Sequence, residues 1–379
     1  MTFQENIESI DRTRQKFEIW SVIEAEIEKE LHCYTMVFGS SFTLCATTDS
    51  DLDIVIYIPS IQNSLIVLEQ IQSILSSSGI IQDNSIIVKA KCPVLKCVHT
   101  DSKISIDLII NGSEDSTRVR CSHLLYHYAI SDWRFRPLLI AIRIWAKQLG
   151  INDPINHSLS SHSLTIMLIH YLVTCREIED LIEKHPEKFS PRLNVSDLRF
   201  DEWHLNDGEI QNNHEVENCS SLSELFLGFL SYFAYFDTEK YGITISGKYN
   251  RLDPKLHATR DFSRKLQHFL IQDPFDYKNA ARAIASRKQL DRIKLAFLAG
   301  TIIIDDPINF EDFCEKSRAV MDSLEIKKDK DVHASRQFEN GASCSYKAGR
   351  QPIRYSNERV EVERDDSTSE EETGIYIFM

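Results

Sequence analysis

Residues Gly39–Ile58 read "GSSFTLCATTDSDLDIVIYI", and this stretch places two aspartates on either side of one leucine, directly before an apolar run. Alternate side chains of a β-strand share a face, so Asp51 and Asp53 point the same way, about 6.6 Å apart along the strand. The opposite, buried face takes the apolar residues of the run: Leu52, Ile54, Ile56 and Ile58. Carboxylates that serve only solubility do not need this spacing, so it indicates a local requirement for both.

This requirement is typical of a site for two divalent cations. Phosphoryl-transfer enzymes use two such ions, about 3.5–4 Å apart, to clamp the attacking and leaving oxygens, and hard oxygen ligands favour Mg²⁺ or Mn²⁺. A third carboxylate is needed, and "KISIDLII" (103–110) supplies Asp107 in a second strand-like run. Ahead of the pair, Gly39 and Ser40 follow the strand-like "YTMVF", where a helix N-terminus and a hydroxyl can hold a triphosphate.

Composition excludes several classes of protein. The 379 residues are 42% hydrophobic and 26% charged, which is ordinary for a soluble globular protein with two domains. The charged, helix-patterned start does not resemble a signal peptide, and no apolar run is long enough to span a membrane. Nine scattered cysteines indicate reduced thiols in a cytosolic or nuclear setting. A net charge of −14 predicts weak binding of polyanions by bulk electrostatics.

Periodicity divides the chain into segments of different structure. Residues 2–31 have apolar positions at helical spacing, and from Cys33 to Ile110 strand-like runs alternate with one helical run. From about Arg120 to Ala319 helices dominate, for example "RPLLIAIRIWAKQLG" with Pro137 in its first turn. Beyond about residue 321 the pattern is lost and acidic residues cluster, so we expect disorder there.

These motifs carry a family resemblance. "FGS", a ten-residue gap, "DLDI" and the later "SIDLI" are similar to the nucleotidyltransferase motif of the DNA polymerase β-like superfamily. "ISDWRFRPLLIAIRIWAKQLGIND", "SLSSHSLTIMLIHYLV" and "DPFDYKNAARAI" resemble blocks of terminal uridylyltransferases and cytoplasmic poly(A) polymerases, most closely the germline type. The resemblance covers roughly residues 15–300. It implies an α+β fold and template-independent addition of AMP from ATP to RNA 3′ ends.

The resemblance also implies a division into a small mixed-sheet catalytic domain and a mostly helical central domain. We expect four parts: an N-terminal helix (1–31) packing on the central domain, the nucleotidyltransferase domain (32–118), the helical central domain (119–320) and a disordered acidic tail (321–379).

The family's site residues carry over position by position. Asp51, Asp53 and Asp107 match the metal ligands, with Asp107 also polarising the RNA 3′-hydroxyl for in-line attack. Ser40, after Gly39, matches the residue that binds the β- and γ-phosphates.

Two basic residues one turn apart, Arg143 and Lys147, match a pair of lysines that contact the triphosphate. An arginine in the first position can still bind phosphate, in a forked manner. The alternative is that both belong to a solvated basic helix face.

Two positions depart from the family pattern. In "LSSHS" Ser161 matches a phosphate-binding serine, but His162 replaces the tyrosine that stacks on the base. His162 is either a smaller stacking group or a plain helix-surface residue. In "VRCSHLL" Cys121 replaces an asparagine that reads the ribose, and a thiol is a weak hydrogen-bond partner. Ribose selection is therefore poorer here or carried by Ser122.

The resemblance also implies a nucleotide preference, which depends on the sequence block that begins with Asp-Pro-Phe. Uridylyltransferases of this family carry a histidine shortly after Asp-Pro-Phe, and no histidine follows Phe275 in "DPFDYKNAAR". Asn279 lies near that position, so the resemblance favours adenine over uracil.

No RNA-recognition motif, zinc knuckle or basic stripe is visible, so RNA binding by this acidic chain is expected to need help. The resemblance implies an RNA-binding adaptor of the KH or RRM type, ATP and an RNA 3′ end as partners, no membrane, and a cytoplasmic protein with a nuclear pool left open. Two alternatives remain: a terminal uridylyltransferase, or a non-catalytic scaffold in an RNA-processing complex. A small-molecule nucleotidyltransferase fits the long helical domain less well.

Overall fold

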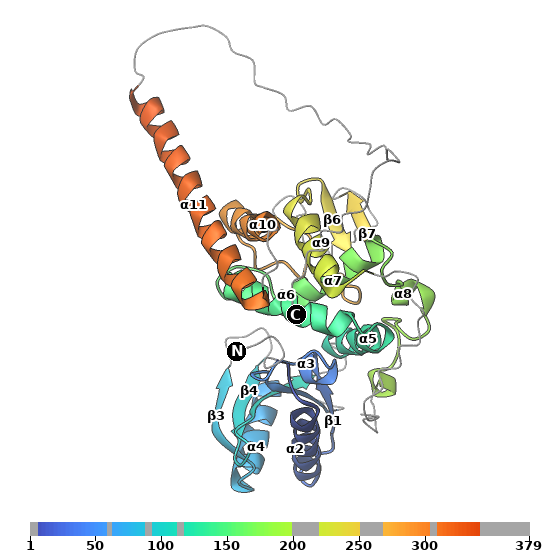
Figure 1. Ribbon diagram of the computed structural model, residues 1–379. Helices are drawn as coiled ribbons and strands as arrows, with labels where there is room; N and C mark the ends of the chain where they lie inside the picture. The colour runs from blue at the N-terminus through green and yellow to red at the C-terminus, as the bar shows by residue number, and fades with distance from the viewer. Residues whose placement is uncertain are drawn as a thin grey trace.

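The computed structural model describes the following residues: 7–58, 63–87, 93–111, 117–198, 220–250, 268–303 and 309–341. They form a sheet domain and a helical domain that lie one above the other in Figure 1. Within these ranges no helix is both long enough and apolar enough to cross a bilayer. The expected α+β architecture is confirmed.

The sheet domain contains a five-stranded mixed sheet in the order β1-β2-β5-β4-β3. Its strands are β1 (Tyr34–Phe38), β2 (Leu52–Tyr57), β3 (Ile81–Ile87), β4 (Val94–His99) and β5 (Ser105–Asn111). The pair β2–β5 is parallel, and the other neighbours are antiparallel. β2 and β5 occupy neighbouring inner positions because their side chains are apolar on both faces, as is typical of strands with covered faces.

Two helices, α2 (Ile10–Glu28) and α4 (Ser64–Ser77), cover one face of this sheet (Figure 1). Ile23 and Ile27 of α2 are fully buried in the same core as Ile54 of β2. The prediction that the N-terminal helix packs on the central domain is therefore wrong. An amphipathic stripe shows that a helix needs an apolar partner without showing which one, and here the partner is the sheet.

A buried ion pair fixes the start of α2 to the motif loops. Lys16 and Glu8 are both buried and form a salt bridge. The Lys16 ammonium also donates to Ser41 Oγ (3.1 Å) and to the carbonyl oxygen of Ser50 (2.7 Å). Ser41 Oγ in turn donates to the carbonyl of Asp51 at 3.1 Å. The N-terminal segment thus holds the backbone on which the first motif aspartate sits.

The opposite face of the sheet is covered by helix α5 (Thr117–Ser131) and the short 3₁₀ helix η1 (Val195–Leu198). A small second core forms there from residues of three strands, α5 and η1: Met36, Phe38, Val55, Tyr57, Ile109, Val119, Val195 and Leu198. Asp53 lies on the same face of β2 as Val55, two residues before it, at the end of the strand that lines the cleft described below.

The helical domain surrounds an aromatic core. Its remaining elements are α6 (Phe135–Gln148), α7 (Ser161–Thr174), α8 (Leu181–Lys184), α9 (Leu222–Ala234), β6 (Tyr241–Thr244), β7 (Gly247–Asn250), α10 (Arg287–Ile302) and α11 (Phe310–Gly341). Trp145 of α6 lies 5.2 Å from Phe297 of α10 and 6.4 Å from Phe226 of α9 between ring centroids. Pro137 stands in the first turn of α6, as predicted.

The last helix, α11, extends further than the sequence pattern indicated. Its first turns bury Phe313 and Cys314, and among the side chains described up to residue 326 Met321 is the last one buried in the core. The helix then continues to Gly341, so the prediction of disorder from residue 321 is wrong for 321–341. Glu and Lys have a high intrinsic helix propensity, which does not require packing against an apolar partner. This propensity explains why the segment is helical although its sequence lacks amphipathic periodicity. The acidic run of the tail lies outside the described residues.

Candidate active site

The three motif aspartates meet at one end of the sheet. The parallel register of β2 and β5 places Asp53 directly opposite Asp107, and register partners on neighbouring strands are about 4.7–4.9 Å apart. Asp51 lies two residues earlier, where the chain enters β2. Burial, and after it the charge of Asp107, raises the pKa of both Asp51 and Asp53. The structure thus brings together all three side chains that the sequence singled out.

This cluster carries more negative charge than its surroundings neutralise. Burial, followed by the charges of Asp107 and Asp51, raises the pKa of Asp53 to about 7. Burial and Asp107 also raise the pKa of Asp51. Carboxylate oxygens are the hard donors that Mg²⁺ and Mn²⁺ favour. Divalent cations would offset both the burial and the mutual repulsion that raise these pKa values, so the donor set fits the predicted metals.

One basic residue at the cluster was missed by the sequence analysis. Lys96 of β4 is the register partner of Asp107, and its ammonium bonds both carboxylate oxygens at 2.7 and 2.5 Å. The only signal for Lys96 in the sequence is its alternation with apolar neighbours in "VLKCV". Its role depends on strand pairing, which no local pattern reveals.

Gly39 is required where the backbone passes the carboxylates. Its φ is +71°, and a Cβ at this position would lie 2.3 Å from Asp53 Oδ2. Only glycine combines this left-handed conformation with so close an approach. Gly39 begins the short helix α3 (Gly39–Phe42), in which Ser40 follows.

Ser122 connects this loop to the helical domain. The backbone N–H of Gly39 donates to Ser122 Oγ at 2.8 Å, and Ser122 Oγ donates to the carbonyl of Arg118 at 2.9 Å. A hydroxyl has one donor and two acceptor positions, so one lone pair remains. The contact between Ser122 and a ribose hydroxyl stays a prediction. The ribose hydroxyl would have to donate its hydrogen to this remaining lone pair of Ser122 Oγ.

A cleft of about 1140 Å³ opens between the two domains beside the carboxylates. Nine of the predicted site residues line it: Gly39, Ser40, Asp51, Asp53, Ser122, Arg143, Lys147, Ser161 and His162. Additional basic groups on the wall are Arg118, Lys278 and Arg282. Its volume is ample for a nucleotide, and acidic and basic side chains share its wall.

Arg143 and Lys147 differ in how they meet this cleft. The Arg143 guanidinium donates to the carbonyl of Cys45 at 3.2 Å and to Thr165 Oγ1 at 3.1 Å, and burial lowers its pKa. Lys147, one turn later, is exposed. Arg143 is therefore fixed in the wall, whereas the Lys147 side chain extends into solvent.

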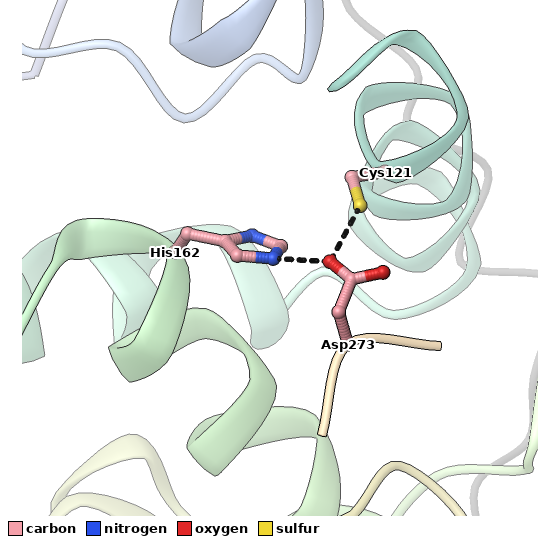
Figure 2. A group of neighbouring side chains, drawn as sticks. All are labelled: Cys121, His162 and Asp273. Carbon is pink, nitrogen blue, oxygen red and sulfur yellow. Dashed lines mark hydrogen bonds and ion pairs between the residues drawn. The ribbon is translucent and has the colours of Figure 1, made fainter. Parts of the chain in front are cut away.

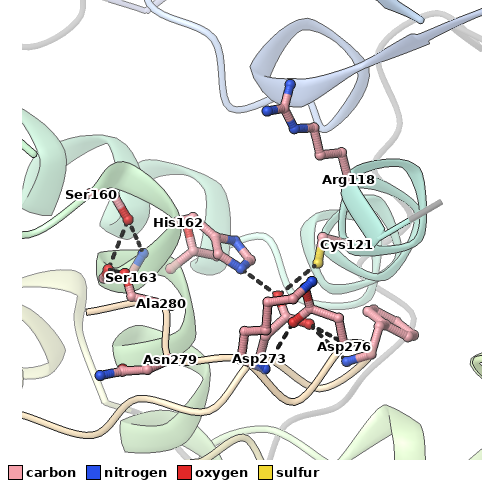
Figure 3. A network of polar contacts seen from close by, with 12 residues as sticks. Arg118, Cys121, Ser160, His162, Ser163, Asp273, Asp276, Asn279 and Ala280 are labelled. Carbon is pink, nitrogen blue, oxygen red and sulfur yellow. Dashed lines mark hydrogen bonds and ion pairs between the residues drawn. The ribbon is translucent and has the colours of Figure 1, made fainter. Parts of the chain in front are cut away.

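Asn279 is placed differently from the prediction. Its side chain is only 3% exposed, and Oδ1 accepts N–H groups from Ile271 and Ala281, both at 2.9 Å. Nδ2 donates to the carbonyl of Phe269 at 2.9 Å. Figure 3 shows this amide pointing away from His162. Asn279 shapes the loop and does not line the cleft, so the expected contact with a base is corrected.

The two departures from the family pattern meet at a third residue. His162 Nε2 lies 2.7 Å from Asp273 Oδ2, and the Cys121 thiol donates to the same oxygen at 3.5 Å (Figure 2). Burial opposes ionisation of Asp273, but the hydrogen bond and charge of His162 lower its pKa. The sequence identified Cys121 and His162 separately, and nothing in it indicated that they share a partner.

Comparisons with known proteins agree with this geometry. A family profile described as "Poly(A) RNA polymerase, mitochondrial-like, central palm domain" matches residues 2–130, and "Cid1 family poly A polymerase" matches residues 221–279. The chain is 29% identical over 315 residues to "Poly(A) RNA polymerase gld-2 homolog A" of Drosophila melanogaster. The aligned region covers 79% of this chain and 22% of that protein. The chain is 32% identical over 224 residues to "Poly(A) RNA polymerase GLD2-B" of Xenopus laevis, covering 58% and 41% respectively. The chain therefore spans less than half the length of either relative.

Solved structures show the same fold. The structure of a GLD-2/RNP-8 complex superposes with a TM-score of 0.67 at 24% identity, covering 83% of this chain and 95% of that one. A Cid1 poly(U) polymerase structure superposes with a TM-score of 0.63 at 22% identity, covering 81% and 92%. Family profiles, relatives and fold agree, and the chain is similar to GLD2 poly(A) RNA polymerases in sequence and to GLD-2 and Cid1 structures in fold.

Proposed function

We propose that this protein adds AMP from ATP to RNA 3′ ends without a template, by in-line phosphoryl transfer at Asp51, Asp53 and Asp107. The observation that carries the proposal is the register of β2 and β5, which sets Asp53 opposite Asp107 beside the interdomain cleft. The poly(A) polymerase relatives support RNA as the acceptor and ATP as the donor.

The residues of the cleft have distinct tasks in this proposal. Asp51, Asp53 and Asp107 would hold Mg²⁺ or Mn²⁺, which stabilises charge on the reacting phosphate and generates a better nucleophile. Asp107, oriented by Lys96, accepts the proton of the RNA 3′-hydroxyl. Ser40 and the short helix that begins at Gly39 bind the β- and γ-phosphates. The transition state is loosely bonded, so positioning and charge provide most of the rate.

The basic wall of the cleft completes the triphosphate site. Arg143 is fixed by Cys45 and Thr165, so its position is preorganised. Lys147 follows one turn later and adds a mobile positive charge. Ser161, at the start of α7, lies 3.3 Å from the side-chain amide of Asn152 and adds a hydroxyl. These groups bind the donor, whereas RNA must be held by other means because the chain is acidic.

An RNA-binding adaptor protein of the KH or RRM type is part of the proposal. The superposed GLD-2 structures contain a second protein, RNP-8 in one and GLD-3 in another. The chain's net charge of −14 makes tight RNA binding by bulk electrostatics unfavourable. We propose that the protein acts in the cytoplasm, with a nuclear pool left open.

Primer extension tests the proposal directly. The purified protein is incubated with an oligoadenylate primer and each of the four nucleoside triphosphates, with Mg²⁺ or Mn²⁺. We expect ATP to be incorporated in preference to UTP. The double variant Asp51→Ala/Asp53→Ala should lose nucleotide addition and keep its circular dichroism spectrum.

Other outcomes would assign the protein differently. Efficient use of UTP with little use of ATP would identify a uridylyltransferase and overturn the adenine preference. No addition of any nucleotide, even with candidate adaptors and Mn²⁺, would favour a scaffold. Long-tail synthesis by the isolated protein at physiological salt would argue against an obligatory adaptor.

A further inference from the structure

Three potential metal ligands of different chemistry converge on the cleft wall, apart from the three aspartates. The ligand atoms of Cys121, His162 and Asp273 all lie within 4.8 Å of one another. They come from three separate segments: α5, the first turn of α7, and the loop before Phe275 (Figure 2). Cys121 and Asp273 are buried, and His162 is 38% exposed toward the cleft.

The carboxylate is oriented before any ligand arrives. Asp273 Oδ1 accepts backbone N–H groups from Phe275 at 2.8 Å and Asp276 at 3.1 Å. Those bonds direct Oδ2 toward His162 and Cys121. Backbone contacts of this kind fix a ligating group and sharpen metal affinity.

The first turn of α7 is fixed to the same loop. Ser160 Oγ accepts the backbone N–H of Ser163 at 3.0 Å and caps the helix, and Ser163 Oγ donates to the carbonyl of Ala280 at 2.8 Å (Figure 3). His162 and Asp273 are thereby held on elements that are hydrogen-bonded to each other. Little reorganisation is required to keep the three side chains together.

One of the three distances between ligand atoms already matches a tetrahedral zinc site. With Zn–S of about 2.3 Å and Zn–N and Zn–O of about 2.0–2.1 Å, neighbouring ligand atoms lie roughly 3.3–3.5 Å apart. Cys121 Sγ is already 3.5 Å from Asp273 Oδ2. The His162–Asp273 contact of 2.7 Å is a direct hydrogen bond, which must open by roughly 0.6 Å to admit the ion.

We propose that Cys121, His162 and Asp273 form a binding site for a thiophilic divalent cation, with Zn²⁺ as the preferred ion. Sulfur, imidazole and one carboxylate oxygen favour zinc over the hard cations expected at the aspartate cluster. Binding releases the thiol proton to solvent. His162 coordinates as the neutral tautomer that carries its proton on Nδ1, which leaves the Nε2 lone pair free for the ion. Thiolate and carboxylate then neutralise the dication. Three protein ligands leave the fourth position open toward the cleft.

The ion would occupy part of the cleft that is expected to receive the nucleotide. Coordination fixes the His162 ring against Asp273, so the ring cannot rearrange to stack on a base. Zinc would then compete with nucleotide, and this consequence alone rests on the proposed function. The metal site itself does not depend on it.

Cobalt binding tests the site without any measurement of activity. The full chain is reduced, freed of metal and titrated with Co²⁺ in the Asp51→Ala/Asp53→Ala background, which removes the oxygen-only site. We expect one equivalent of Co²⁺ to bind with a thiolate-to-cobalt charge-transfer band in the near ultraviolet, and Zn²⁺ to displace it. Absence of this band, or binding of Co²⁺ with only weak visible absorption, would overturn the proposal.

Variants assign the ligands. Cys121→Ser should abolish the charge-transfer band, whereas Cys175→Ser, which alters an exposed cysteine, should retain it. His162→Ala, at a partly exposed position, should weaken Co²⁺ binding at least roughly 10-fold, and circular dichroism checks that each variant is folded. A band that persists in Cys121→Ser, or unchanged affinity in His162→Ala, would show that the cluster is only a hydrogen-bonded support.

The inhibitory consequence is measured separately. Primer extension is measured with and without Zn²⁺, and the ratio of the two rates is compared between proteins. This ratio should fall below one in the wild-type protein and stay nearer to one in Cys121→Ser. A protein that shows the cobalt band and adds no nucleotide would refute the proposed function and leave the metal site intact. A protein that adds nucleotide and shows no cobalt band would refute the metal site and leave the proposed function intact.

Discussion

Replacing Gly39 by alanine should damage the aspartate site through a contact of known size. The new Cβ would lie 2.3 Å from Asp53 Oδ2, where real contacts are not shorter than 3.0 Å. The carboxylate must therefore move by a substantial part of an ångström. A misplacement of about 1 Å at a reacting centre costs on the order of 100-fold in rate.

The backbone contributes a second effect. Gly39 has a φ of +71°, and a side chain in the left-handed region costs about 1–2 kcal/mol. Gly79 is a matched control, because its φ is +72° and nothing lies within 4 Å of the position of its Cβ. Gly79→Ala should share the loss of stability and keep its activity.

Two assays separate these effects. Thermal unfolding should show similar decreases in melting temperature, of a few degrees, for both variants. Primer extension with ATP should fall by on the order of 100-fold for Gly39→Ala only. The reasoning is refuted if Gly39→Ala keeps its rate within a few-fold, or if Gly79→Ala loses a comparable amount.

Three further predictions concern stability. Lys16→Met leaves a buried carboxylate without its charged partner, so urea unfolding should show that the free energy of unfolding falls by about 3–5 kcal/mol. As a control, Lys29→Met removes one side of an exposed ion pair and should change the free energy of unfolding by less than about 1 kcal/mol. Burial lowers the pKa of His170 to about 4. The unfolded chain therefore binds a proton below about pH 6.5 that the folded protein does not, and stability should be lost as the pH falls from about 6.5 to 4. A His170→Gln variant with an equally steep pH profile would contradict this. Ser122→Ala removes the acceptor of the Gly39 N–H and should lower the free energy of unfolding by about 1–3 kcal/mol. An unchanged unfolding midpoint in urea would contradict this loss.

The strands and most helices of this protein were predictable because their signals are local. The run after Asp51 alternates with the period of a strand, and β2 covers Leu52–Tyr57 as expected. The helix with Pro137 in its first turn spans Phe135–Gln148, close to the predicted bounds. Spacing along the chain determines both, so no knowledge of distant contacts was needed.

Predictions that depended on packing partners were less successful. The apolar stripe of α2 indicated a buried helix, but the surface that buries it, the sheet, became visible only in the structure. Asn279 follows a recognisable motif, yet its three hydrogen bonds turn the amide into the loop. A polar residue in a motif has the same sequence signal whether it faces a ligand or supports its own backbone.

The amino-acid sequence by itself determined the alternation that puts Asp51 and Asp53 on one face of a strand, and the resemblance of its motifs to those of terminal nucleotidyltransferases. Only the tertiary structure decided that Asp107 stands opposite Asp53, with Lys96 beside it, and that Cys121 and His162 meet at Asp273. The physical reason is that backbone geometry sets side-chain direction locally, whereas strand register and helix docking depend on the burial of apolar surface between segments far apart in the chain.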